Sequence, residues 1–153
     1  MKTCVCALLV VLFILSGCAK QSSKTNAVPL TAEAQRILNA MADSIRINGL
    51  TGWTPFLHNS PQFSWEFNGV HTSYDSLIAG EQREAPLYRS ITLKWDSVNA
   101  ESVGENAMHL TARFSEALVK NDGSEATITG GVDCQLERID GAWKFTRGKT
   151  FDH

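Results

Sequence analysis

The sequence lacks a long apolar run, a large excess of charge, and more than a few prolines or cysteines. A membrane-spanning helix needs about 20 apolar residues, and the stretch Val5–Leu15 is shorter than that. The 14 basic and 16 acidic side chains nearly balance, so no electrostatic reason to bind nucleic acid exists. The 11 glycines and 4 prolines among 153 residues exclude collagen-like and low-complexity chains. An apolar share of 43% instead predicts one compact folded domain.

Short motifs for metal, nucleotide and hydrolase chemistry are also missing. The histidines at 58, 71, 109 and 153 are widely spaced, without the paired spacing that zinc ligands need on one element. Neither a phosphate-binding glycine loop nor a Gly-x-Ser-x-Gly nucleophile elbow occurs. The sequence therefore predicts no metal site and no cofactor.

The first 17 residues have the pattern of a secretory signal peptide. Lys2 precedes the apolar run, and small residues follow it. Segment 15–18, Leu-Ser-Gly-Cys, resembles the lipobox of bacterial lipoproteins, in which the peptidase cleaves before a cysteine that carries diacylglycerol. This resemblance implies lipidation of Cys18 and anchoring to a membrane without spanning it. Ala19 in place of aspartate implies the outer membrane, facing the periplasm. An ordinary secretory signal and a short buried helix are the alternatives.

The polar segment 18–28 has no apolar periodicity and is expected to be a flexible tether, so the folded domain is expected to cover residues 29–153. Cleavage would remove Cys4 and Cys6, and acylation would block Cys18. Cys134 would then be the one free thiol, with no partner for an intramolecular disulfide. We expect it to be a small buried core residue, because no His, Asn or Asp motif accompanies it as in a nucleophilic site.

Helices are predicted in the first half of the domain. Apolar residues at three- and four-residue spacing predict a first helix over residues 32–47. A turn or two of a second helix is expected at residues 53–57, where Pro55 limits its length. A third helix is expected between the capping residue Ser73 and Pro86.

Strands dominate the second half. Alternating apolar and polar residues predict strands at residues 63–67, 90–98, 107–119, 125–139 and 142–151. Glycine-containing turns are expected at Asn68-Gly69, Asn121-Asp122-Gly123 and Asp140-Gly141. Gly130-Gly131 interrupts one strand and predicts a β-bulge there. Helices followed by antiparallel strands indicate an α+β domain with its helices on one face of a curved sheet.

This order of elements, and above all segment 138–145 (Arg-Ile-Asp-Gly-Ala-Trp-Lys-Phe), resembles the nuclear transport factor 2-like superfamily, which includes ketosteroid-isomerase-like and polyketide-cyclase-like proteins. The resemblance covers residues 31–152. It implies a cone-shaped, strongly curved antiparallel sheet wrapped by about three helices, with a pocket at the open end, and a homodimer through the sheet. Isomerase-like members use a Tyr and a neutral carboxylic acid as donors. Helix 32–47 has no Tyr, and its Asp43 is expected to face solvent, so that pattern is absent.

Aromatic residues are the main candidates for a ligand site, with core packing as the alternative role for each. Those expected near the pocket are Trp53, Phe56, Trp65, Phe67, Tyr74, Tyr88, Trp95 and Phe114. Strand alternation places Glu116 inward with Phe114, and Arg147 and Lys149 inward with Phe145. These charges would orient a polar ligand group or form a salt bridge at the rim. Glu66 is the other candidate base, although alternation places it opposite Trp65.

The sequence thus predicts an envelope protein whose pocket binds a small, partly apolar ligand or a partner protein without catalysis. The alternative is an isomerase-, cyclase- or dehydratase-like enzyme that uses Glu116 or Glu66 as general base in an apolar cavity. A third possibility is a structural subunit that dimerises through the open sheet face.

Overall fold

A computed structural model describes residues 29–152. The predicted signal peptide (1–17), the lipidation site Cys18 and the tether (18–28) lie outside the described residues. The elements, in chain order, are α1 (Leu30–Asn48), the 3-10 helix η1 (Gly49–Phe56), β1 (Ser64–Phe67), β2 (Val70–Thr72), α2 (Tyr74–Glu84), the 3-10 helix η2 (Ala85–Leu87), β3 (Tyr88–Gly104), β4 (Ala107–Lys120), β5 (Glu125–Ile139) and β6 (Ala142–Asp152). No helix between residues 29 and 152 has the length and apolar character needed to cross a membrane.

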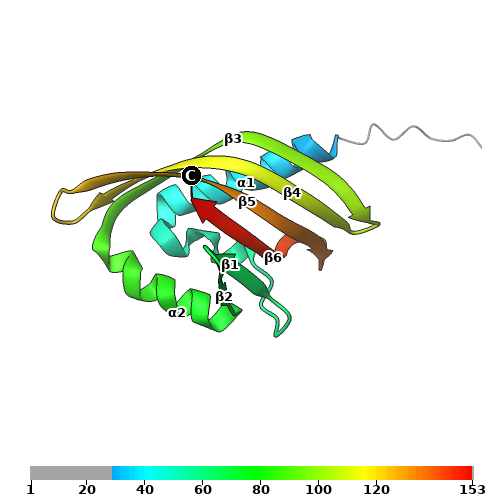
Figure 1. Ribbon diagram of the computed structural model, residues 1–153, viewed down its shortest axis with the longest axis horizontal. Helices are drawn as coiled ribbons and strands as arrows, with labels where there is room; N and C mark the ends of the chain where they lie inside the picture. Colours follow the sequence, from blue (N-terminus) through cyan, green and yellow to red (C-terminus); the bar gives the residue numbers. More distant parts are fainter. Residues whose placement is uncertain (1–28, 153) are drawn as a thin grey trace, which may run out of the picture.

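The six strands form one curved sheet in the order β2-β1-β6-β5-β4-β3, and the helices lie on its inner side (Figure 1). The domain is α+β, as predicted. The expectation of a purely antiparallel sheet was wrong at one position, because β1 runs parallel to β6. The sheet does not close, since β2 and β3 are its two edges. Its concave side holds the core and the cavity described below.

Helix α1 supplies the largest apolar surface that covers the sheet. Its buried residues recur at helical spacing and are Ala34, Ile37, Leu38, Met41 and Ile45. Gly49 ends the helix with a φ of 69°, which the backbone of glycine tolerates without strain. The side chain of Trp95 fastens β3 to this helix by donating a hydrogen bond from Nε1 to the Leu38 carbonyl oxygen at 3.0 Å.

Where three helices were expected, the described chain has two α-helices and two short 3-10 helices. The second predicted helix is the 3-10 segment η1, which contains Pro55. Its middle lies close against α1, because a Cβ on Gly52 would lie 2.4 Å from the Ser44 carbonyl oxygen. The third is α2, whose N-cap Ser73 accepts a hydrogen bond from the Ser76 backbone N–H at 3.3 Å.

The predicted turns are present, with left-handed backbone at Asn68-Gly69 and Asp140-Gly141. Strand β3 extends six residues beyond the predicted end at 98, because a bulge between Trp95 and Val98 breaks the alternation that identified it. The bulge predicted at Gly130-Gly131 is absent, and the β4–β5 register continues through it. These glycines instead allow close packing, since a Cβ at Gly130 would lie 2.8 Å from Phe114 Cζ.

Candidate functional site

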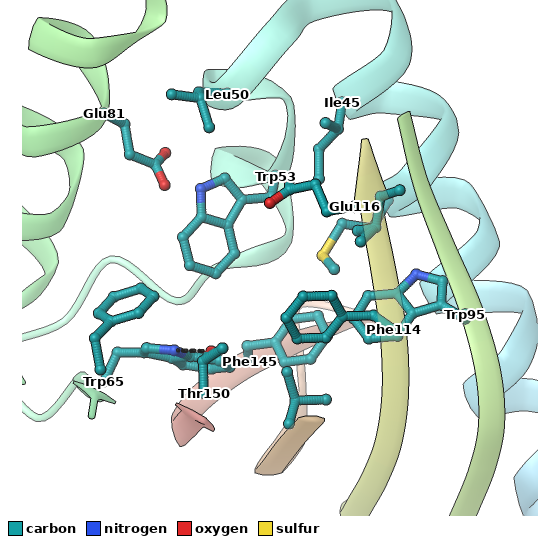
Figure 2. Close-up of a pocket in the computed structure, with 14 residues that line it drawn as sticks. Ile45, Leu50, Trp53, Trp65, Glu81, Trp95, Phe114, Glu116, Phe145 and Thr150 are labelled. Atoms are coloured by element: carbon teal, nitrogen blue, oxygen red, sulfur yellow. Dashed lines mark hydrogen bonds between the residues drawn. The ribbon is translucent and has the colours of Figure 1, made fainter. Parts of the chain in front are cut away.

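A cavity of about 170 Å³ lies between the concave side of the sheet and the helices (Figure 2). Helices α1, η1 and α2 form one wall, and strands β1, β3, β4, β5 and β6 form the other. The 14 lining residues are mostly apolar: Met41, Ile45, Leu50, Trp53, Trp65, Phe67, Glu81, Leu93, Trp95, Phe114, Glu116, Val132, Phe145 and Thr150. Phe67 is 38% exposed, so the cavity wall reaches the protein surface at this ring.

Three tryptophans shape the cavity, and hydrogen bonds hold two of them. Trp65 donates from Nε1 to Thr150 Oγ1 at 2.9 Å, and Trp95 donates to the backbone of α1. Trp53 meets Trp65 edge to face, with ring centroids 5.7 Å apart and an interplanar angle of 87°. Because these rings are held by polar contacts at their edges and by neighbouring rings, the wall is preformed.

Gly148 makes room for Trp65. A Cβ at this position would lie 2.8 Å from Trp65 Cζ3 and 2.5 Å from the Cβ of Cys134. The glycine therefore lets the indole lie directly against β6. Cys134 is 2% exposed, which confirms the prediction of a buried core residue, and burial raises the pKa of its thiol.

Glu81 enters the cavity from α2 (Figure 2). Its Oε2 atom is buried and has no hydrogen-bond partner within residues 29–152. Burial raises the pKa of this carboxyl to about 7, and the nearby charges of Glu84 and Glu116 act in the same direction. The indole nitrogen of Trp53 points toward Glu81 in Figure 2, and its interaction with the carboxylate partly opposes this shift of the pKa.

Glu116 approaches the cavity from the opposite side, on β4 (Figure 2). It lies on the cavity wall with Phe114, the position that strand alternation gives it. Burial raises the pKa of this carboxyl as well. The cavity thus holds two carboxyl groups whose neutral forms are favoured by their surroundings.

The inward placement predicted for Arg147 and Lys149 was wrong. Leu136 pairs with Phe145 but Gln135 pairs with Arg147, so Thr146 is an extra residue in β6. This bulge reverses the alternation, and both basic side chains lie on the outer face of the sheet. There Arg147 Nε donates to Gln135 Oε1 at 3.0 Å, and Lys149 Nζ lies 3.7 Å from Asp133 Oδ2.

Glu66 also lies on the outer face, where His71 Nε2 is 3.3 Å from its Oε2. Among the predicted aromatic residues, five line the cavity: Trp53, Trp65, Phe67, Trp95 and Phe114. Three do not, although they pack against the core: Phe56, Tyr74 and Tyr88. Tyr74 packs edge to face on Phe63 at 5.7 Å rather than on the cavity.

Sequence reasoning missed Glu81. Leu77 is the only buried residue of α2, so the apolar stripe of this helix is narrow and its inner face is hard to recognise. One signal was available, because residues four apart lie on the same side of a helix. Glu81 follows Leu77 by four residues and therefore shares its face.

Comparison with protein-family models and with curated proteins finds no match. Solved structures do match. A protein assigned as a scytalone dehydratase from Novosphingobium aromaticivorans superposes with a TM-score of 0.69 and 10% identity, over 78% of this chain and 81% of that one. A nuclear transport factor 2-like superfamily protein from Salmonella enterica superposes with a TM-score of 0.67 and 18% identity, over 79% of this chain and 89% of that one.

A hexachlorocyclohexane dehydrochlorinase is also similar, with a TM-score of 0.62 and 13% identity, over 81% of this chain and 88% of that one. Proteins with this architecture include both enzymes and members without an assigned reaction. At such low identity the similarity extends to the fold alone. The domain therefore has the nuclear transport factor 2-like fold, as the sequence resemblance predicted.

Proposed function

We propose that this domain binds one ring-sized, partly apolar small molecule in the cavity, with a polar group of the ligand directed at Glu81 and Glu116. The observation that carries the proposal is a preformed aromatic cavity of about 170 Å³ with two carboxyl groups in its wall. For scale, an engineered apolar cavity of about 150 Å³ holds benzene. A six-membered ring with a short substituent therefore suits this volume.

The expected affinity is modest. A ligand of this size has few atoms, and binding efficiency per non-hydrogen atom has an upper limit. We expect dissociation constants of about 10 μM to 1 mM for unoptimised ring compounds. Such values are measurable by titration calorimetry.

The test is titration of the full chain with toluene, p-cresol and benzyl alcohol. Leu93→Phe enlarges a side chain that lines the cavity, whereas Val98→Phe enlarges one on the same strand outside it. We expect about tenfold weaker binding in the first variant and unchanged binding in the second. Leu50→Phe, on η1, repeats the test from another wall if the first variant is unstable. Equal binding by the folded cavity variants and the parent would contradict the proposal.

A second candidate function is proton transfer catalysed by Glu81. Two properties of Glu81 favour this function: its raised pKa of about 7, and its oxygen in the cavity that has no hydrogen-bond partner in the described part of the chain. A general base works best when its pKa is near the working pH. In such a step Glu81 would take a proton from a C–H bond beside a carbonyl. The bonding pair would move toward the carbonyl, and the proton would then return to the ligand.

Deuterium exchange tests this second candidate. In D2O, a ring-sized ketone bound in the cavity should gain deuterium beside its carbonyl, as followed by NMR. Glu81→Gln should abolish the catalysed exchange, and Glu125→Gln, on an exposed residue of β5, should not change it. Exchange no faster than without protein would argue for a binding role only.

We also propose that Cys18 anchors the domain by lipid to the outer membrane, facing the periplasm. The support is the sequence of segment 15–18 and Ala19. Expression in a two-membrane bacterium with an alkyne-labelled fatty acid should label the parent chain and not Cys18→Ala. Label retained in the variant, or parent protein in the soluble periplasmic fraction, would refute the anchor.

A further inference from the structure

The ionisable groups of the cavity wall are all acidic. Among its 14 lining residues in the described chain, Glu81 and Glu116 can carry a negative charge, and none is a lysine, arginine or histidine. Two basic residues of β6, Arg147 and Lys149, face the other side of the sheet. Neither carboxylate therefore has a cationic partner in the wall.

Buried carboxylates without a partner are costly, because charge is poorly solvated in an apolar environment. Glu81 bears this cost directly, since its Oε2 is buried and makes no hydrogen bond to any residue from 29 to 152. Glu116 adds a second acidic group to the same space. A ligand that brings positive charge would remove the cost at both groups.

The aromatic walls suit the same kind of ligand. Trp65 and Trp95 use their indole N–H groups in hydrogen bonds within the protein, so those polar atoms are not available to a ligand. What remains for contact are ring surfaces, which attract cations electrostatically, tryptophan most strongly. Aromatic rings combined with carboxylates are a favourable surrounding for an ammonium group on an apolar body.

We propose that the ligand of this cavity is a small organic cation, an amine or quaternary ammonium compound, whose charged group lies between Glu81 and Glu116 while its apolar part contacts the tryptophan rings. This inference rests on the proposed binding function and specifies its ligand class. An anionic ligand would meet two like charges and no basic side chain in the wall. A neutral ligand would leave the carboxylates without a counter-charge.

Affinity for a cation should rise with pH. The charged groups that act on Glu81 are Glu84 and Glu116, both acidic, and the neutral indole of Trp53 also interacts with its carboxyl group. As pH rises through about 7, Glu81 loses its proton and attracts a cation more strongly. The affinity for a neutral molecule of the same shape should not rise.

The test compares benzylammonium with benzyl alcohol, two ligands of matched size, by calorimetric titration of the full chain at pH 5.5 and 8. At pH 8 we expect benzylammonium to bind about tenfold more tightly than benzyl alcohol. At pH 5.5 this preference for the cation should be smaller. Glu81→Gln or Glu116→Gln should reduce the preference severalfold. Glu125→Gln, which removes the same charge from the exposed start of β5, should keep it.

The possible results separate the two proposals. Equal affinity for both ligands, or a preference for the alcohol, would overturn the cation proposal while the binding function stands. Binding of neither ligand would overturn both. A preference for the amine that persists in both glutamine variants would show that general surface charge causes it, and would also overturn the cation proposal.

Discussion

Glu81 places an acidic group inside an apolar wall, and this placement has a measurable thermodynamic consequence. In an unfolded chain its carboxyl has the ordinary pKa near 4.5, whereas in the folded protein burial raises the pKa to about 7. The folded state therefore holds a proton that the unfolded state releases between these pH values. The contribution of Glu81 to the free energy of unfolding is therefore greatest below pH 4.5. This contribution is lost as pH rises to 7.

Glu81→Gln should remove this loss. At pH 8 we expect the variant to have a free energy of unfolding about 1–2 kcal/mol higher than the parent, after allowance for solvent screening. At pH 4.5 the difference should be small. Urea unfolding at both pH values measures it, with Glu125→Gln as the control for loss of one exposed charge. A variant that is less stable at pH 8 would show that the ionised carboxylate is well solvated.

Gly148 sets the position of Trp65, and its substitution tests that contact. Gly148→Ala would force a methyl group against Trp65 and Cys134, and we expect a loss of about 1–3 kcal/mol in unfolding free energy. The matched control is Gly80→Ala in α2, where the nearest atom is a side-chain nitrogen of Arg83 at 3.8 Å. That change should stabilise the protein by about 0.5–1 kcal/mol, since alanine favours helices. Equal effects at both positions would contradict this account.

Of the two α-helices in the cavity wall, α2 is the less firmly held. It buries one residue, Leu77, whereas α1 buries five. Local opening is easiest where few apolar contacts oppose it. The helix that carries Glu81 is therefore also the one best suited to admit a ligand.

Hydrogen exchange should show this difference. We expect backbone amides of α2 to exchange about tenfold faster than those of α1, and to slow when benzyl alcohol or benzylammonium binds. Ser73→Ala removes the N-cap and should speed exchange in α2 without affecting α1. Equal protection of the two helices would contradict the weak attachment of α2.

Strands were predictable where alternation continues and misjudged where it breaks. Residues 107–119 alternate without interruption, and the structure forms β4 there with Glu116 on the cavity wall. Strand β3 was predicted too short and the face of Arg147 was reversed, because bulges add a residue that period-two reasoning cannot see. Glu81 was missed for another reason, since one buried residue does not define a helix face.

At the scale of the whole molecule, the shifted groups together set how stability depends on pH. Hydrogen bonding to Arg36 lowers the pKa of the half-buried Glu33, so its small contribution is lost as pH falls below 4.5. Hydrogen bonding to Asp133 raises the pKa of His109, so its contribution is present below 6.5 and lost as pH rises through the raised value. Glu81 and Glu116 act in the same direction as His109.

We therefore expect the greatest stability of the domain near pH 5 and a decline toward pH 8. Thermal unfolding followed by circular dichroism across pH 4–9 measures the profile. The double variant Glu81→Gln, His109→Gln should flatten the decline above pH 5. A melting temperature of the parent protein that rises from pH 5 to 8 would contradict the raised pKa values of Glu81, Glu116 and His109.

The extra residue in β6 has a consequence for how such chains are compared. A strand with the same side chains and regular pairing would hold Arg147 and Lys149 inside, where they would neutralise the two glutamates. Gaining or losing one backbone irregularity would thus cancel the negative charge of the cavity without a substitution. Close homologues aligned column by column could then differ in whether their cavities favour a cation, and pairing register would predict their ligands better than residue identity.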